Sequence, residues 1–267
     1  MDKRLETNRI NWNERTAVHA ASDFYDVDGF KAGQLTLKDI ERAEIGPIAG
    51  KSLLHLQCHF GLDTVSWARL GAQATGVDFS DDAVELARAL NAEVGTDARF
   101  FCSNLYDLPN VLTEEFDIVF TSYGILCWLP DLDRWAEVAF RYLKPGGTFY
   151  MVEFHPVLQT LEPSASGEAL PSYSYFCQEL YLPGDGPSYA GSETIASPNY
   201  EWQHSLGEIV TALVGSGLRI EFLHEFPFCH YQALPNMVQG DDGWWRFPEK
   251  NESIPQMFSI RATKPCP

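Results

Sequence analysis

The stretch Ser52-Leu-Leu-His-Leu-Gln-Cys-His-Phe-Gly-Leu-Asp63, followed by Ala74-Thr-Gly-Val-Asp-Phe-Ser80, decides the fold of this chain. Its two apolar parts, Ser52–Leu56 and Ala74–Phe79, are typical of buried strands. The segment between them predicts a helix that ends before Gly71, because glycine suits the left-handed position that closes many helices. Short strands joined by a helix predict a parallel βαβ unit, since right-handed crossovers return each strand in the same direction.

The same alternation continues to about residue 155. Ser80 is a good N-cap for a helix whose apolar residues from Ala83 to Leu90 recur at helical spacing. Further strands are predicted at 99–102, 116–121 and 148–154, with a helix over 131–143. Because these strands are apolar throughout, we predict an α/β fold, a doubly wound and mostly parallel sheet with helices on both faces.

After residue 155 this rhythm breaks, although one domain over 1–267 remains the simplest organisation for this length. A capping box at Ser205 and Glu208 predicts a helix to about Val214. Strands are expected at 218–226 and 257–263. We divide the domain into an N-terminal region (1–49), a core (50–155), a loop-rich insertion (156–203) and a C-terminal part (204–267) with a long loop at 227–255.

Composition excludes several classes of partner. The formal net charge of -18 disfavours nucleic acid and anionic membranes, which attract basic surfaces. The chain has no apolar run long enough to cross a bilayer, and residues 1–12 lack the apolar stretch that is typical of a signal peptide. None of the six cysteines forms a Cys-x-x-Cys pair. We therefore expect a cytoplasmic protein without a membrane partner.

The carboxyl ends of the first two strands are the expected ligand site, because open parallel sheets bind ligands where the strand order reverses. Asp78 ends the second strand, about 20 residues after the first turn, which is the position that grips a ribose in nucleotide-type sites. A carboxylate there can accept hydrogen bonds from both ribose hydroxyls.

The stretch from Leu53 to Ser80 resembles motifs I and II of the class I S-adenosylmethionine-dependent methyltransferases. Asn104 matches the place where that family contacts adenine, and 143–147 resembles its turn into strand five. Within the family, the sequence of residues 54–61, Leu-His-Leu-Gln-Cys-His-Phe-Gly, resembles a bacterial small-molecule-methyltransferase-like group. The resemblance implies a seven-stranded Rossmann-like sheet with one antiparallel strand, with S-adenosyl-L-methionine as methyl donor and S-adenosyl-L-homocysteine as product.

The chain departs from the family in its glycine-rich turn. The usual pattern is acidic-x-Gly-x-Gly-x-Gly, whereas this chain has His55, Gln57, His59 and Gly61 at these positions. Either the cofactor binds with Gln57 and His59 in place of bare backbone, which we favour, or binding is altered or lost. The same side chains would crowd a pyrophosphate more than a sulfonium cofactor, so they disfavour an NAD-dependent oxidoreductase.

Candidate site residues follow from these positions. In the resembled fold an N-terminal segment covers the cofactor, so 1–49 is a lid region that Tyr25 or Phe30 would close. His55 is expected to be structural and to bond the loop backbone. Metal binding is not expected, because His204 and Glu208 share a helix face without a third ligand. The cofactor-binding candidates are Gln57, His59, Gly61, Asp78, Phe79, Asn104, Leu105, Ser122 and Tyr25. The catalytic candidates are His155, His204 and Tyr123.

Aromatic residues gather in the two irregular stretches: Tyr173, Tyr175, Phe176, Tyr181, Tyr189, Tyr200, Trp202, Phe228, Tyr231, Trp244 and Trp245. We interpret them as walls of a pocket for a small, partly apolar acceptor. A second small core or a dimer contact is the alternative, so the chain is a monomer or a homodimer. The predicted function is methyl transfer to that acceptor. The alternatives are a non-catalytic ligand- or protein-binding module with the same fold and, less favoured, an NAD-dependent oxidoreductase.

Overall fold

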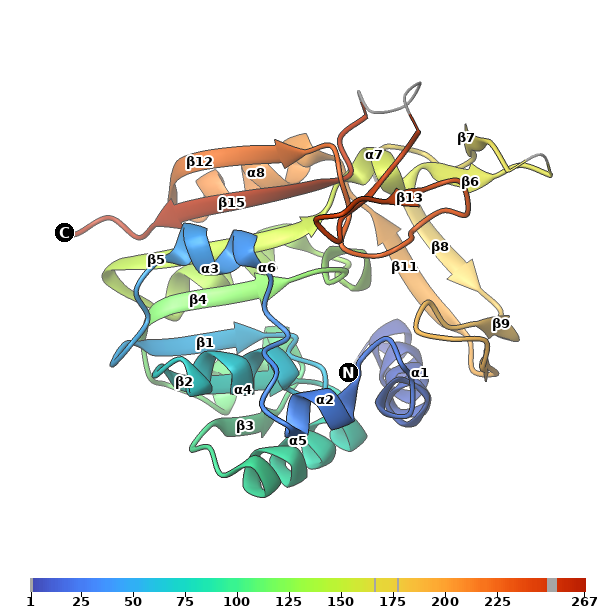
Figure 1. Cartoon of the computed structure of the whole chain (residues 1–267). Helices are drawn as coiled ribbons and strands as arrows, with labels where there is room; N and C mark the ends of the chain where they lie inside the picture. Colours follow the sequence, from blue (N-terminus) through green and yellow to red (C-terminus); the bar gives the residue numbers. More distant parts are fainter. Residues whose placement is uncertain (1, 166, 177, 249–253) are drawn as a thin grey trace.

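The computed structural model describes residues 2–165, 167–176, 178–248 and 254–267 (Figure 1). Cys177, one further position of the insertion and residues 249–253 of the predicted 227–255 loop lie outside the described residues.

Seven strands form one central sheet in the order β12-β15-β5-β4-β1-β2-β3. The strands from β5 to β3 are parallel, and β15 runs antiparallel to both of its neighbours. The predicted seven-stranded, mostly parallel α/β fold is therefore confirmed. The strands are β1 (Ser52–Leu56), β2 (Gln73–Asp78), β3 (Arg99–Cys102), β4 (Phe116–Ser122), β5 (Leu143–Phe154), β12 (Arg219–Phe226) and β15 (Met257–Thr263).

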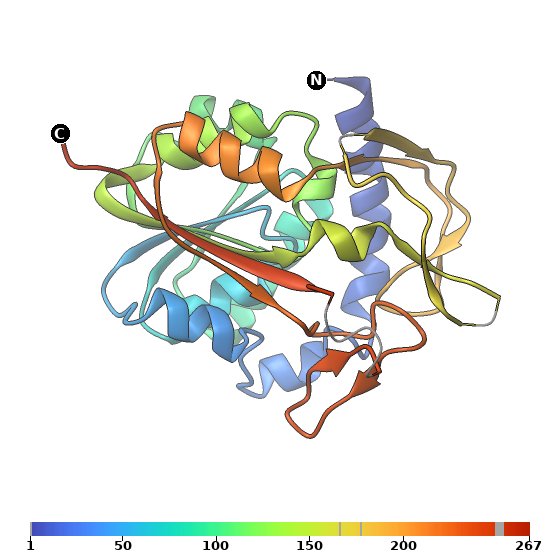
Figure 2. The same ribbon diagram turned by 90° about the horizontal axis from the view of Figure 1, so that it is seen from above.

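Helices cover both faces of this sheet (Figure 2). One face packs against α3 (Asp39–Ile45), α4 (Leu62–Arg69) and α5 (Asp81–Val94), and the other against η1 (Leu105–Asn110), α6 (Leu132–Arg141) and α8 (Leu206–Gly215). Strand side chains alternate between the two cores, so both faces must be apolar.

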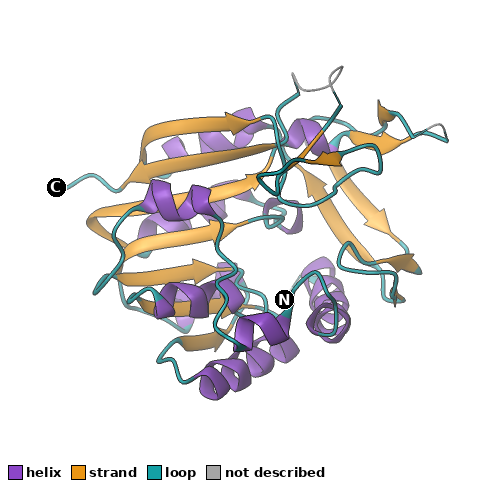
Figure 3. Ribbon diagram, viewed as in Figure 1, coloured by secondary structure: helices purple, strands orange, loops and turns teal. Residues whose placement is uncertain are grey.

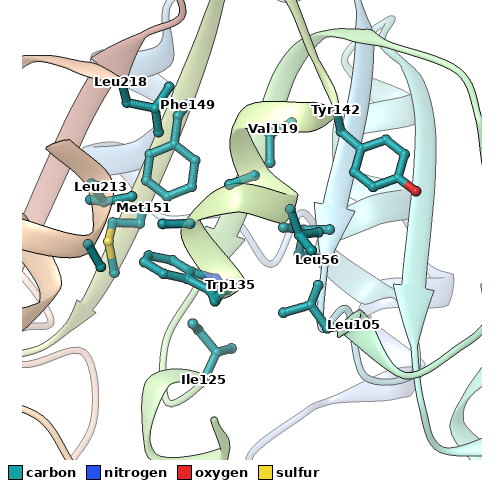
Figure 4. Packing of buried hydrophobic residues seen from close by; sticks show 14 of the residues in the cluster. Leu56, Leu105, Val119, Ile125, Trp135, Tyr142, Phe149, Met151, Leu213 and Leu218 are labelled. Carbon is teal, nitrogen blue, oxygen red and sulfur yellow. The ribbon is translucent and has the colours of Figure 1, made fainter. Parts of the chain in front are cut away.

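Trp135 of α6 is the largest side chain of one of these cores. It packs with Leu56, Phe149 and Met151 from the strands and with Leu213 of α8 (Figure 4). Side chains one position along the same strands, such as Leu53 and Tyr150, enter the opposite core. This alternation buries each strand on both sides, which explains the continuous apolar runs of the sequence.

Local signals set most of the helix boundaries. Ser80 Oγ accepts a hydrogen bond from the Ala83 N–H (3.1 Å) at the start of α5. Ser205 and Glu208 form the predicted capping box at the start of α8. The helix expected over 131–143 ends at Arg141, because Leu143 already pairs with Phe116 of β4. The turn between Leu143 and Thr148 is a register shift within β5, so this strand begins at Leu143.

The insertion, predicted as irregular, forms short hairpins. Most of these strands are only two or three residues long, which is too short to give a periodic pattern. The remaining strands are β6 (Leu161–Pro163), β7 (Ala169–Pro171), β8 (Gln178–Leu182), β9 (Gly186–Pro187), β10 (Thr194–Ile195), β11 (Asn199–Gln203), β13 (Val238–Gln239) and β14 (Trp245–Arg246). The remaining helices are α1 (Lys3–Ala20), α2 (Val27–Lys31), η2 (Leu126–Trp128) and α7 (Pro156–Gln159).

The long helix α1 and the hairpins lie at the end of the sheet to which the parallel strands point (Figure 3). Asn8 Nδ2 donates to the Tyr200 carbonyl (2.8 Å), and the Tyr200 N–H donates back to Asn8 Oδ1 (2.7 Å). Glu14 likewise accepts a hydrogen bond from the Ser197 N–H (2.9 Å). These bonds fix α1 against β11 and so build a wall beside the carboxyl ends of the strands.

Within the described residues, none of the helices is both long and apolar enough to span a bilayer.

Candidate functional site

A cavity of about 850 Å³ opens at the carboxyl ends of β1, β2 and β4. It lies where the strand order reverses, because β2 and β3 follow on one side of β1 whereas β4 and β5 lie on its other side. This is the usual place for ligands in such sheets. Small-molecule pockets span roughly 300–1,000 Å³. The volume is therefore sufficient for a nucleoside-sized ligand together with a second compact molecule.

The loop after β1 has left-handed backbone at alternate residues. The φ angles are 56° at Gln57, 51° at His59 and 80° at Gly61. Only glycine adopts this conformation freely, and other residues in it are strained by about 1–3 kcal/mol each. The loop thus has, at positions 57 and 59, the backbone conformation that glycine would supply, although both residues carry side chains.

Asp78 fastens this loop to the end of β2. Its Oδ2 accepts a hydrogen bond from the His59 N–H (2.8 Å), and its Oδ1 accepts one from the Ser80 N–H (2.9 Å). The residue is 7% exposed, and burial raises the pKa of its carboxyl to about 6. Each oxygen retains acceptor capacity, and the residue lines the cavity, so the carboxylate can receive hydroxyl donors from a ligand.

The side chains of Gln57 and His59 line the same cavity. Gln57 Nε2 donates to the Ile125 carbonyl (3.2 Å), and His59 Nε2 lies 2.9 Å from Nδ1 of His19. Gln57 Oε1 and His59 Nδ1 are buried and have no hydrogen-bond partner in the described part of the chain. Buried polar atoms are normally paired, so these two are available to a ligand.

Gly61 begins α4 and is fixed by packing as well as by its φ angle. A Cβ at this position would lie 2.5 Å from Cε1 of Phe100 in β3. The nearest neighbour of this glycine is therefore an aromatic ring of the core, while the residue also lines the cavity.

The other cofactor-binding candidates also reach the cavity. Asn104 Oδ1 accepts a hydrogen bond from the Tyr106 N–H (2.9 Å) and starts η1, while Ser122 Oγ donates to Asp63 Oδ2 (3.2 Å). The Tyr25 hydroxyl lies 2.5 Å from that of Tyr189. All the residues predicted to bind the cofactor therefore line one cavity: Tyr25, Gln57, His59, Gly61, Asp78, Phe79, Asn104, Leu105 and Ser122.

The buried carboxylate of Glu153 holds the backbone of the loop after β4. Glu153 of β5 accepts hydrogen bonds from the Ile125 N–H (2.7 Å) and the Leu126 N–H (3.3 Å), and from the Gly124 N–H. Tyr123 in this loop lines the cavity with φ at 32°, and its hydroxyl donates to Glu41 Oε2 (3.0 Å). Glu153 therefore positions the segment that carries one of the catalytic candidates.

His155 and His204, the other two catalytic candidates, do not line the cavity. His155 Nδ1 accepts a hydrogen bond from the Val157 N–H (3.1 Å) as the N-cap of α7, and its Nε2 lies 3.0 Å from Glu225 Oε1. His204 Nε2 lies 2.7 Å from the Leu129 carbonyl oxygen. Both rings make structural contacts, so we do not retain them as catalytic candidates.

Other expectations need adjustment. His55 bonds the side chain of Thr64 (2.9 Å) in α4, where a contact with loop backbone was expected. Glu208 is engaged in the capping box with Ser205, and no group of three or more potential metal ligands occurs among the described residues. Phe30 lines the cavity, as expected for the lid region, but it is 1% exposed and also packs in the core, with the Arg69 guanidinium 4.3 Å from its ring.

The cavity residues that were not identified from the sequence include Arg15, Glu201 and His230. The Arg15 guanidinium lies 5.8 Å from the Trp12 ring and 5.7 Å from the Trp128 ring. Arg15 forms no ion pair with a carboxylate of the described residues; its Nε donates to Asn11 Oδ1 (2.6 Å). Burial raises the pKa of Glu201, although the nearby Arg15 charge opposes this.

The aromatic residues of the irregular stretches divide into separate groups. Tyr189, Tyr231 and Trp245 line the cavity. Phe228 and Trp244 pack instead against a separate core around Leu234, Met237 and Phe247. The predicted pocket walls and the predicted small core thus both occur, each built from part of the set. The remaining aromatics of the set do not line the cavity: Tyr173, Tyr175, Phe176, Tyr181, Tyr200 and Trp202.

Comparison with known proteins places this geometry in context. Residues 54–151 match a family described as a methyltransferase domain. A ubiquinone biosynthesis O-methyltransferase of Xanthomonas oryzae pv. oryzae is 30% identical over 134 residues, which cover 49% of this chain and 56% of the relative. The protein of the same description from Idiomarina loihiensis is 31% identical over 135 residues, covering 49% and 55%. The chain thus spans about half the length of the curated relatives it matches.

Solved structures share the fold. An S-adenosylmethionine-dependent methyltransferase from Mesorhizobium loti has a TM-score of 0.60 and 21% identity, covering 84% of this chain and 95% of that one. The glycopeptide N-methyltransferase MtfA complexed with S-adenosylmethionine has a TM-score of 0.53 and 17% identity, covering 84% and 90%. At these identities the likeness establishes the fold alone.

Proposed function

We propose that this chain is a class I S-adenosylmethionine-dependent methyltransferase, and that it transfers the methyl group of S-adenosylmethionine to a small, partly apolar acceptor. The observation that carries the proposal is Asp78, a buried carboxylate that braces the left-handed loop and faces the cavity. The same atoms that hold the loop in shape are those that would grip a ribose.

The residues fit the nucleoside part of this cofactor. Asp78 has acceptor capacity for two hydroxyl donors beside its two backbone partners. Asn104 keeps its amide N–H₂ group for a purine edge, because its bond to Tyr106 uses only Oδ1. Phe79 and Leu105 supply apolar surface in the same cavity.

The residues also fit an amino-acid tail. Arg15 offers a cation without a carboxylate partner, and Glu201 offers a carboxylate in the same cavity. We assign Arg15 to the carboxylate of the tail and Glu201 to its ammonium group. Gln57 Oε1 and His59 Nδ1, both buried and unpaired within the described chain, would complete the polar lining.

The bound cofactor supplies an activated methyl group on a sulfonium. The protein therefore has to position the two reactants, shield them from water and accept the proton that the acceptor releases. Trp12, Tyr25 and Trp128 line the cavity and reduce access of water to it. Tyr123, fixed by its bond to Glu41, lies at the end of β4 beside the expected position of methyl transfer. None of these roles needs a covalent intermediate with the enzyme.

The same geometry argues against a dinucleotide. A pyrophosphate needs close approach to bare backbone at a free helix N-terminus. Here Gln57 and His59 project side chains into that space, and His59 is held by His19. An amino-acid tail can meet these polar groups, whereas a pyrophosphate would collide with them.

A truncated ligand tests the proposal. The protein should bind S-adenosylhomocysteine more tightly than methylthioadenosine, which lacks the amino-acid tail. In an Arg15→Met variant this preference should shrink by roughly 1.5–3 kcal/mol, the worth of a charged hydrogen bond. Arg9→Met, on the same helix but outside the cavity, is the matched control.

Equal affinity for the two ligands in the wild type would contradict the assignment of the tail. Failure of both ligands to bind would contradict the proposed function itself. A cytoplasmic location, the absence of a nucleic-acid partner and a monomeric or homodimeric state remain predictions from the sequence.

A further inference from the structure

Part of the cavity lining is a cluster of aromatic rings. Phe24, Tyr189 and Tyr231 form a connected set, with ring centroids 5.5 to 6.4 Å apart. Phe154 joins it through Tyr231 at 5.2 Å. These side chains come from the N-terminal region, the insertion, β5 and the loop after β12, so the wall is a product of the tertiary structure.

His230 adds a buried ring nitrogen to this wall, in addition to the hydroxyl groups of Tyr189 and Tyr231. Its ring makes an edge contact with Tyr123 (4.5 Å between centroids) and lies 5.4 Å from Phe154. Its Nε2 is buried and has no hydrogen-bond partner among residues that the structure describes. Because Tyr123 follows β4, this nitrogen lies next to the expected position of methyl transfer.

The imidazole is neutral in this setting. Burial lowers the pKa of His230 to about 3, and the positive charge of Lys38 acts in the same direction. A neutral imidazole keeps one nitrogen as a hydrogen-bond acceptor. An acceptor nitrogen inside an aromatic wall fits a ligand that is flat, apolar and equipped with one donor.

We propose that the acceptor is an aromatic hydroxyl compound, and that Nε2 of His230 accepts the hydrogen bond of the hydroxyl group that becomes methylated. This inference rests on the proposed function and adds the substrate class and a catalytic residue. The ring of the acceptor would stack in the wall formed by Phe24, Phe154, Tyr189 and Tyr231.

Oxygen is favoured over nitrogen because of what the reaction requires. A neutral amine attacks without help, whereas a hydroxyl oxygen is a weak nucleophile until its proton is drawn away. The acceptor oxygen forms a bond to the methyl carbon, and the carbon–sulfur bond breaks with its electron pair remaining on sulfur. The hydroxyl proton passes to Nε2 of His230 and then to water.

The low basicity of His230 is compatible with this step. As the oxygen–carbon bond forms, the hydroxyl turns into a protonated ether, which is a far stronger acid than an imidazolium. The proton is therefore taken up late, and before that the imidazole serves to orient the hydroxyl.

A pair of ligands tests the proposal without a turnover assay. The probes are β-naphthol and its methyl ether, which share a ring system but differ in the donor hydroxyl. Equilibrium dialysis against the protein saturated with S-adenosylhomocysteine measures the affinity for each. We expect both to bind the wild type, with β-naphthol favoured, and His230→Phe to weaken β-naphthol alone by roughly fivefold.

Two further variants complete the design. His230→Gln keeps a hydrogen-bond acceptor and should retain part of the preference. His224→Phe is the matched control, because His224 is 51% exposed and pairs with Glu44 outside the cavity.

Each other outcome is decisive. If S-adenosylhomocysteine binds but neither probe does, the aromatic acceptor is wrong while the proposed function stands. If His230→Phe weakens both probes equally, the ring only packs and the hydrogen bond is wrong. If S-adenosylhomocysteine itself does not bind, the proposed function fails and this inference fails with it.

Discussion

Replacing Asp78 by asparagine separates the ribose contact from the architecture of the loop. The side chain keeps its shape but loses its charge, and only one of its two terminal atoms can still accept a hydrogen bond. In the wild type both oxygens already hold a backbone N–H, from His59 and from Ser80. Asparagine can satisfy one of these donors and would turn its own N–H₂ group toward the other.

The effect on stability is the sum of opposing contributions. An unsatisfied buried N–H costs about 1–3 kcal/mol, whereas removal of a buried charge is favourable because burial disfavours the ionised carboxyl. We therefore expect the free energy of unfolding to change by less than about 2 kcal/mol, so that the variant still folds.

The loss of affinity for the cofactor is not offset in this way. Two hydroxyl donors to a carboxylate are worth about 1.5–3 kcal/mol each, and asparagine can replace only one of them with a weaker neutral bond. A loss of about 2–3 kcal/mol corresponds to a roughly 30- to 150-fold increase in Kd.

Isothermal titration with S-adenosylhomocysteine measures this increase. Asp82→Asn is the matched control, because Asp82 is an exposed residue near the start of α5 and does not line the cavity. An unchanged Kd in a folded Asp78→Asn variant would refute the ribose assignment, and with it the main support for the site.

Four further predictions follow from the same geometry. Cofactor affinity should be constant above about pH 7 and fall by about tenfold per pH unit below pH 6, because only ionised Asp78 accepts both hydroxyls and its pKa is raised to about 6; titration at several pH values checks this, and Asp78→Asn should remove the dependence. Gln57→Gly should be more stable than Gln57→Ala by about 1 kcal/mol in urea unfolding, since only glycine is unstrained at a φ of 56°; equal stability would mean that the loop is not left-handed there. Gly61→Ala should lower stability by more than about 2 kcal/mol, because the new Cβ meets Phe100 in a left-handed backbone; a neutral change in the melting temperature would contradict this packing. Glu153→Gln should cost about 3 kcal/mol of stability, since the amide cannot accept all of the N–H donors of the loop after β4; thermal unfolding measures the loss.

The core of the fold and the ribose position could be predicted because their signals are local. The strands and helices between residues 52 and 154 repeat apolar patterns that packing on both faces requires. The predicted role of Asp78 follows from its place at the end of the second strand. Its bond to the His59 N–H also explains why the altered turn can keep its shape without two of its glycines.

The parts of the cavity that we assign to the amino-acid tail and to the acceptor had no such signal. Arg15, Glu201 and His230 are far apart in the sequence and meet only because α1, β11 and the loop after β12 fold against one end of the sheet. A single histidine in an irregular segment has no period or motif that would mark it.

His155 and His204 had a signal in the sequence but do not line the cavity. Each stands beside a strand end or a helix cap, which suggested a functional position. In the structure the cap itself or a neighbouring carbonyl uses the ring, because a helix start next to a sheet edge has its own polar groups to satisfy.

The most direct test of the account is a side-by-side calorimetric titration of the wild-type protein with S-adenosylhomocysteine and with NAD. The account predicts one-to-one binding of S-adenosylhomocysteine in the micromolar range, about -8 kcal/mol, and no binding of NAD. Binding of NAD in its place, or of neither ligand, would contradict the claim that this cavity is a methyltransferase site.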